Sequence, residues 1–229
     1  MKYALFSDIH GNIYAFEAMM NELRHEEIDG YLFCGDLTGY YYHAREIMEF
    51  IERLPNFYAV RGNHDELFLN ALSNNGTQYE AIKKYGSSYK NLDAKIAKYI
   101  QTLPEVLTLN IGRYHVAVLH GSPMAPLLGR IYPDSEIDLP PLEYDFLFVG
   151  HTHYQMVRLH EKNCKIVNPG SLGQPRDGKG FCYCIIDFAT GNVEHKCVEF
   201  DKSLLLKEIA ERDAEIAYLS EVLNRNRRG

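Results

Sequence analysis

The chain has 229 residues, 46% of them hydrophobic, and a formal net charge of −7, a composition typical of a soluble globular protein. The acidic balance excludes a generally basic surface, so nucleic acid is not an expected partner and a nuclease would need a local basic strip. No apolar run is long enough to span a membrane, and the first residues enter a strand without a signal-peptide pattern, which predicts a cytoplasmic protein. Five cysteines lack a CxxC motif and lie mostly in apolar runs, which favours small buried side chains over a redox or zinc-thiolate role.

The first part of the chain alternates strands with helices. Buried strands are predicted over 2–7, 31–34 and 57–60, and amphipathic helices over 13–25 and 44–53. Asn12 stands where it can cap the first of these helices. The β-α-β-α-β order with short links predicts parallel strands.

Residues 66–103 differ because they contain no strand-like run. Helices are predicted over about 78–86 and 91–102, after a turn at Asn74-Asn75-Gly76. We interpret this segment as a helical insertion, which serves either as a lid over the strand ends or as an ordinary pair of packing helices.

The second part of the chain is rich in strands, and a helix ends it. Strands are predicted over 106–111, 114–119, 145–149, 155–159, 164–167, 181–187 and 193–200. Residues 124–143 are expected to form a loop with short helical pieces. The apolar stripe of a helix over 203–226 either covers the sheet or pairs with a second copy, so a homo-oligomer stays open. We expect one domain over residues 1–229.

Polar side chains with metal-binding chemistry follow five of the predicted strands. They are Asp8, His10, Asp36, Asn63, His64, His120, His151 and His153. In an extended segment residues two apart point to the same side, so Asp8 and His10 could bind one metal ion together, and His151 and His153 are expected to place two imidazoles on one side. Because the strand ends of an α/β sheet lie on one edge, all these groups can converge. Aspartate and histidine without cysteine suit manganese, iron, zinc or nickel, and the number of groups suits two adjacent ions.

The stretch Arg61-Gly62-Asn63-His64-Asp65 combines four kinds of chemistry. Asn63 offers a carbonyl oxygen to a metal, and His64 can carry a proton near neutral pH. Arg61 either contacts phosphate or forms a salt bridge. Asp65 either orients a histidine or caps the next helix, and the cap is favoured.

The order of motifs resembles the calcineurin-like metallophosphoesterase superfamily. The motifs are Asp8-Ile9-His10, Gly35-Asp36, Gly62-Asn63-His64-Asp65, His120-Gly121 and Gly150-His151-Thr152-His153. Residues 35–40 and 168–177 resemble the small prokaryotic phosphodiesterases of the YfcE-like group. The resemblance covers roughly residues 2–200 and implies an α/β fold, a four-layer α/β/β/α sandwich of two mixed sheets with flanking helices.

The resemblance also implies a role for each matching residue. Asp8, His10 and His153 would bind a first metal ion, Asn63, His120 and His151 a second, and Asp36 would bridge them. His64 matches the catalytic histidine, and Arg61 matches a phosphate-binding arginine of related phosphatases. A hydroxide that bridges the ions would attack phosphorus while His64 protonates the leaving group. The implied cofactors are two divalent ions, with manganese first and iron, zinc or nickel as alternatives.

The implied substrate is a small phosphorylated molecule, with a nucleotide as one candidate and a phosphodiester favoured over a phosphomonoester. Asn168, Ser171 and Arg176 lie in a loop that the family places near the site, where they contact substrate or stabilise tight turns. Tyr40, Tyr41 and Tyr42 line a nucleotide-sized pocket or pack against the lid. The alternative function is a catalytically weak scaffold or binding module on the same fold, against which the presence of His64 argues.

Overall fold

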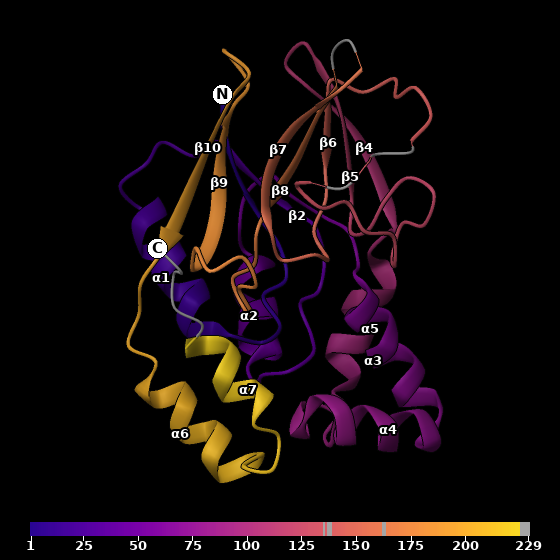
Figure 1. The fold of residues 1–229 in the computed structure, drawn as a ribbon, viewed down its shortest axis with the longest axis vertical. Coiled ribbons are helices and arrows are strands. Elements are labelled where there is room, and N and C mark those ends of the chain that lie inside the picture. Colours follow the sequence, from indigo (N-terminus) through magenta and orange to yellow (C-terminus); the bar gives the residue numbers. More distant parts are fainter. Residues whose placement is uncertain (135, 137–138, 162–163, 225–229) are drawn as a thin grey trace.

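Two mixed five-stranded sheets form the centre of the structure, and helices lie against them (Figure 1). The structure is a computed structural model that describes all residues except 135, 137–138, 162–163 and 225–229. The first sheet has the order β10-β9-β1-β2-β3 and the second the order β4-β5-β6-β8-β7. This arrangement confirms the predicted fold class.

The first sheet is parallel where the chain alternates with helices and antiparallel where a hairpin adds to it. Its strands are β1 (Lys2–Phe6), β2 (Gly30–Phe33), β3 (Phe57–Ala59), β9 (Phe181–Asp187) and β10 (Asn192–Val198). β1, β2 and β3 pair in parallel, whereas β9 pairs antiparallel with both β1 and β10. The parallel strands are linked by α1 (Ile13–Leu23) and α2 (Ala44–Ile51). As predicted, the Asn12 side chain caps α1, accepting a hydrogen bond from the Ala15 backbone amide at 3.2 Å.

The second sheet has the same mixed character. Its strands are β4 (Val106–Ile111), β5 (Tyr114–Leu119), β6 (Phe146–Phe148), β7 (Gln155–His160) and β8 (Cys164–Pro169). β5, β6 and β8 pair in parallel, and the outer strands β4 and β7 are antiparallel to their neighbours. The parallel centres of both sheets therefore send several strand ends toward one edge.

Alternating side chains divide the core into layers. Leu5, Leu32 and Phe148 belong to the cluster between the sheets, while Phe6 packs with Phe16 of α1 on the outer face of the first sheet. This alternation follows from the two-residue period of a strand. The outer face of the second sheet packs against residues of the irregular segment between β5 and β6, among them Ile131.

The insertion is more helical than the sequence predicted. It contains α3 (Asn63–Ser73), α4 (Asn75–Tyr85), the short 3-10 helix η1 (Ser87–Tyr89) and α5 (Ala94–Thr102). The expectation missed α3, whose first residues are the site motif itself. The predicted turn at Asn74 is a junction between helices, because the Asn74 side chain accepts from the amides of Gly76 and Thr77 and starts α4 at once.

The predicted single helix over 203–226 is wrong in its continuity. The chain forms α6 (Ser203–Arg212), α7 (Tyr218–Glu221) and the 3-10 helix η2 (Val222–Asn224), and residues 225–226 lie outside the described part. The break falls at Asp213, whose buried carboxylate accepts hydrogen bonds from Ser87 and from the Tyr42 hydroxyl at 2.9 Å. These contacts with other segments hold Asp213 outside helical geometry.

Two cysteines expected to be unpaired form a disulfide between the neighbouring strands β9 and β10. Cys182 and Cys197 are direct partners in the register of this hairpin. The two cysteines are equally far in sequence from the turn at residues 187–192. This spacing indicates that they can pair, and the argument from composition overlooked it. Cys34, Cys164 and Cys184 are free and buried, as expected.

Candidate metal centre

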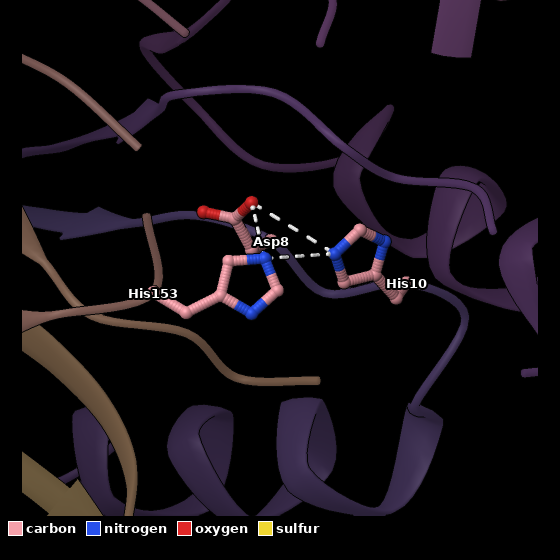
Figure 2. Close-up of side chains that lie close together, drawn as sticks. All are labelled: Asp8, His10 and His153. Atoms are coloured by element: carbon pink, nitrogen blue, oxygen red, sulfur yellow. Dashed lines mark hydrogen bonds and ion pairs between the residues drawn. The ribbon is translucent and has the colours of Figure 1, made fainter. Parts of the chain in front are cut away.

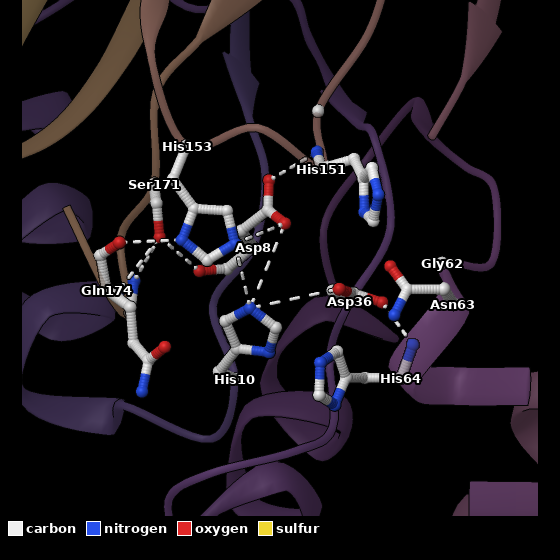
Figure 3. A network of polar contacts seen from close by, with 12 residues as sticks. Asp8, His10, Asp36, Gly62, Asn63, His64, His151, His153, Ser171 and Gln174 are labelled. Atoms are coloured by element: carbon white, nitrogen blue, oxygen red, sulfur yellow. Dashed lines mark hydrogen bonds and ion pairs between the residues drawn. The ribbon is translucent and has the colours of Figure 1, made fainter. Parts of the chain in front are cut away.

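Six of the predicted ligands, Asp8, His10, Asp36, Asn63, His151 and His153, lie close together at strand ends (Figure 3), and the seventh, His120, contacts Asp36 and Asn63. The loops that carry them are joined through their backbones. Asp8 donates its amide to the Gly35 carbonyl at 2.9 Å, and His10 donates to the Asp36 carbonyl at 3.0 Å. In the second sheet, the Gly150 amide donates to the His120 carbonyl at 2.8 Å. These backbone hydrogen bonds therefore hold neighbouring strand ends together without a contribution from a metal ion.

Five of the predicted ligands have a left-handed backbone. The φ angles are 53° at Asp8, 51° at His10, 64° at Asp36, 64° at His151 and 62° at His153. Such angles are uncommon for residues other than glycine and tend to gather at functional sites. The premise that these loops are extended is therefore wrong, even though Asp8 and His10 do meet.

The first cluster consists of Asp8, His10 and His153 (Figure 2). The Nε2 atom of His153 lies 3.1 Å from Asp8 Oδ1 and 3.3 Å from His10 Nε2. All three side chains are at most 2% exposed. Three ligand-type atoms from two strand ends thus lie within 4.8 Å of one another in the interior.

The second cluster consists of Asp36, Asn63, His120 and His151, and Asp8 of the first cluster lies close to it, with its Oδ1 4.0 Å from His120 Nε2. His120 Nε2 lies 3.3 Å from Asp36 Oδ2 and 3.0 Å from Asn63 Oδ1. Asp36 Oδ2 also lies 3.8 Å from His10 Nε2, so Asp36 stands between the two clusters. His151 packs its ring 5.1 Å from that of His120, and its Nε2 accepts a hydrogen bond from Arg130 Nε at 3.3 Å.

His151 and His153 contact different partners, contrary to the expectation that the His-x-His alternation places both imidazoles on one side. His153 contacts the first cluster, and the ring of His151 packs against that of His120. Figure 3 shows His151 and His153 pointing to different places. The left-handed backbone at both residues rotates the two side chains apart. The same loop thereby supplies one imidazole to each cluster.

Backbone carbonyls orient three of the imidazoles. Nδ1 lies 2.9 Å from the Thr38 carbonyl in His10, 2.7 Å from the Cys34 carbonyl in His120, and 2.6 Å from the Gln174 carbonyl in His153. A carbonyl can only accept, so each Nδ1 carries a proton and each Nε2 is the nitrogen that a metal ion can bind. This arrangement is the usual support of a metal-bound histidine.

Buried charges of opposite sign set the pKa values of these groups. Burial alone would raise the pKa of Asp36, but His120 outweighs it and the pKa lies well below its usual value. Burial lowers the pKa of His120, yet the Asp36 carboxylate prevails and raises it to about 9. For His151, burial and the neighbouring His120 lower the pKa to about 4. The carboxylates therefore draw positive charge into the site, as protons or as cations that replace them.

One carboxylate oxygen indicates whether metal ions fit this site. Asp8 Oδ1 is buried and has no hydrogen-bond partner among the described residues. The Nε2 atoms of His153, His10 and His120 lie 3.1, 3.8 and 4.0 Å from it. An unsatisfied buried carboxylate oxygen is costly, and cations between it and these nitrogens would satisfy all of them. The donor set of carboxylate, amide and imidazole groups without thiolate also fits.

His64 lies beside the clusters but belongs to neither. Its backbone amide donates to Asp36 Oδ1 at 2.8 Å, and its Nδ1 lies 3.1 Å from the Tyr89 hydroxyl. The ring packs 4.8 Å from Tyr40 and 4.7 Å from Tyr85. Burial lowers the pKa of His64 to about 4, against the opposing pull of Asp36.

Asp65 ties two strand ends together, and the predicted helix cap is confirmed. Its carboxylate accepts from the Gly62 amide at 3.0 Å at the start of α3. The same carboxylate accepts from the amides of Asp36 and Thr38, each at 2.9 Å. Burial and the nearby Asp36 raise the pKa of Asp65 to about 6. The residue therefore fixes the loop of Asp36 against the helix that starts at Asn63.

Arg61 points to acidic side chains outside the clusters. Its guanidinium lies 2.8 Å from Glu105 and 3.2 Å from Glu66, and it donates to the Leu103 carbonyl at 3.2 Å. Of the two interpretations left open, the salt bridge is the one observed. Its contact with phosphate stays a prediction.

The loop after β8 supports the clusters from behind. Asn168 is fully buried and donates to the Gly150 carbonyl at 2.7 Å, while Ser171 donates to the Asp8 carbonyl at 2.8 Å. These bonds position the loops that carry His151 and Asp8; substrate contact by either residue stays a prediction. Arg176 bonds to Tyr218 and lies within electrostatic reach of Asp8 and Tyr40.

The insertion and the C-terminal segment meet beside the first cluster. Tyr40, whose ring lies 4.7 Å from that of His10, contacts Tyr85 of α4 at 5.4 Å and Tyr218 of α7 at 6.1 Å. Asp213 links the same two segments through Ser87. The tyrosines after Asp36 thus pack against these segments, which is one of the two interpretations given above.

Residues 1–191 match the model of the calcineurin-like phosphoesterase superfamily domain. The chain belongs to this superfamily. An uncharacterised protein of Methanocaldococcus jannaschii is 32% identical over 86% of this chain and 87% of its own. A metallophosphoesterase from Sphaerobacter thermophilus has a similar structure, with a TM-score of 0.76 and 25% identity over 97% of this chain and 99% of its own.

The predicted resemblance to YfcE is also found. The YfcE phosphoesterase of E. coli has a TM-score of 0.53 and 18% identity over 87% of this chain and 100% of its own, which shows a shared fold. Superfamily members use dinuclear metal centres, and the described residues of this protein include two groups of aspartate and histidine side chains that can hold metal ions. No helix in the described residues is long and apolar enough to cross a membrane.

The sequence argument missed Arg130, Tyr89 and Gln174. Arg130 and Tyr89 reach the centre from segments without a motif, the loop after β5 and the 3-10 helix η1, and nothing in their local sequence indicates a site. Gln174 lies in the loop over residues 168–177, which the sequence did single out, but it contacts His153 through its backbone carbonyl, which its residue type does not indicate.

Proposed function

We propose that this protein is a dimetal-dependent phosphoesterase that hydrolyses a phosphodiester of a small molecule, with a small phosphomonoester as the alternative. The observation that carries the proposal is the pair of clusters linked by Asp36, beside a histidine that belongs to neither. The diester comes first because the motifs resemble those of YfcE-like phosphodiesterases.

We assign the side chains to the ions as the superfamily pattern suggests. Asp8, His10 and His153 would hold one divalent ion, Asn63, His120 and His151 would hold the other, and Asp36 would contact both. Manganese is the first candidate, with iron, zinc or nickel as alternatives. The chemistry that two such ions supply is activation of water for attack on phosphorus and neutralisation of the phosphate oxygens.

His64 would give its proton to the leaving oxygen. The His64 backbone amide donates to Asp36, and the Tyr89 hydroxyl on Nδ1 fixes the orientation of the ring. Because burial disfavours the imidazolium in the free protein, the negative charge of a bound phosphate would be needed to stabilise the protonated form. Substrate binding and protonation of His64 would therefore be linked.

A protein of net charge −7 needs a local positive source to hold an anionic substrate. The two ions would supply most of this charge, and Arg176 beside Asp8 would add to it. A nucleotide is one candidate substrate. The absence of a generally basic composition argues against a nuclease.

The test is hydrolysis of bis(p-nitrophenyl) phosphate and p-nitrophenyl phosphate by protein stripped of metal and reloaded with manganese. We expect turnover only after reloading and faster turnover of the diester. His64→Ala should lower the rate by about 10²- to 10⁴-fold, the usual range for a general acid, with metal content unchanged. His25→Ala, at an exposed position, is the control. No turnover with any of the four metals, together with one stoichiometric protein partner, would favour the scaffold function.

A further inference from the structure

A second arginine, which no motif indicated, lies at the accessible side of the second cluster. Arg130 donates from Nε to His151 Nε2 at 3.3 Å. Its side chain is exposed, whereas Asp36 and His120 beside His151 are at most 1% exposed. Arg130 therefore stands between the buried centre and solvent, where a substrate would enter.

The loop that carries Arg130 is held in a defined shape. Ser122 and Ala125 exchange backbone hydrogen bonds at 3.1 and 3.0 Å, and the Gly129 amide donates to the Ala125 carbonyl at 2.8 Å. A side chain at Gly129 would collide with the Ser122 hydroxyl, so only glycine fits there. The loop thus presents Arg130 from a fixed position, which lowers the entropic cost of using it.

Arg130 and Arg61 differ in the charges that surround them. Arg61 is neutralised by Glu66 and Glu105. Among the described residues, no carboxylate forms an ion pair with Arg130, whose charge is therefore available to an anion. Arginine suits phosphate because its planar donors match two oxygens at once.

We propose that Arg130 binds a phosphoryl oxygen of the substrate at the open side of the second cluster. This inference rests on the proposed phosphoesterase function. The lone pair of His151 Nε2 cannot accept the hydrogen bond from Arg130 and bind a metal ion at the same time. When His151 acts as a ligand, the Arg130 donor turns to the anion beside it.

The inference is tested by calorimetric titration of manganese-loaded protein with inorganic phosphate. Arg130→Gln keeps a donor for His151 but removes the charge, and Arg130→Lys keeps the charge but loses the planar fork. Arg113→Gln, at the exposed β4–β5 turn, is the matched control. Metal content is measured for each protein, so a lost ion is not mistaken for a lost phosphate contact.

We expect Arg130→Gln to weaken phosphate binding about 10- to 100-fold, the range for a charge-assisted hydrogen bond. Arg130→Lys should recover part of the loss. In Arg130→Gln, KM for the diester should rise in parallel, and both ions should remain bound.

Equal phosphate affinity in wild type and Arg130→Gln would overturn the inference. Loss of the second ion in Arg130→Gln would also overturn it, because Arg130 would then be a positioning residue for His151. Wild-type protein that hydrolyses the diester without measurable phosphate binding would also overturn it while the phosphoesterase function stands. If neither hydrolysis nor phosphate binding occurs, both proposals fail.

Discussion

The two clusters are built from similar side chains but differ in how firmly they are held. In the first cluster, both imidazoles are anchored by backbone carbonyls and are at most 2% exposed. In the second, His120 is anchored in the same way, while His151 is 9% exposed and shares its Nε2 with Arg130. The first cluster thus resembles a fixed structural element, and the second is the side at which a ligand can be exchanged.

The surroundings explain this difference. Tyr40, Tyr85 and Tyr218 pack together beside the first cluster. Beyond the second lies the loop of Arg130, whose Met124 and Leu128 are 72% and 68% exposed. Substrate would approach over this loop, and the first cluster would hold its ion throughout turnover.

The largest effect is expected at Asp36, which lies between His10 of the first cluster and His120 of the second. Asp36→Asn removes the carboxylate charge between them, so both ions should bind weakly and the hydrolytic rate should fall by at least about 10³-fold. Metal content after gel filtration and the rate with the diester measure the change. Glu194→Gln, at an exposed position, is the control for a lost surface charge. Retention of two ions in Asp36→Asn would contradict the bridging assignment.

The difference between the two clusters is tested by comparing the variants His153→Ala and His151→Ala. We expect His153→Ala to weaken binding of the tighter ion about 100-fold, and His151→Ala to weaken only the weaker ion, about 10-fold. The measurement is a manganese titration followed by calorimetry for each variant. Equal losses would show that anchoring through Nδ1 does not separate the clusters.

A smaller effect is expected at Tyr89, whose hydroxyl holds His64. Tyr89→Phe keeps the packing and removes this contact, so kcat should fall about 10-fold while KM and metal content stay as in wild type. Phe68→Leu, on the same face of the insertion, reports the effect of altered packing without a lost hydrogen bond. A fall in metal content would instead place Tyr89 among the supports of the clusters.

The smallest catalytic effect is expected at Asp213, away from both clusters. Asp213→Ala leaves the Ser87 amide and the Tyr42 hydroxyl without their acceptor, which should lower the free energy of unfolding by about 1–3 kcal/mol. Urea unfolding measures this loss. If the segments only cover the first cluster, binding of the second ion should not change.

The strand ends could be predicted because local patterns specify them. In the part of the chain that the structure describes, apolar runs predicted all ten strands, and every strand end lies within two residues of its prediction. Helix α3 was missed because it begins inside the polar motif, whose residues do not show the apolar periodicity of a helix. The break at Asp213 depends on partners in other segments, which local periodicity cannot reveal.

The sequence by itself determined that aspartates and histidines stand at successive strand ends, because strand order and residue type are local properties. Only the tertiary structure decided which groups meet. Left-handed backbone turns at His151 and His153 send their imidazoles to different clusters. Two glutamates neutralise Arg61, while a tight loop brings Arg130 to the second cluster. The physical reason is that charge pairing and backbone rotation depend on neighbours distant in sequence, which become neighbours only when the two sheets pack.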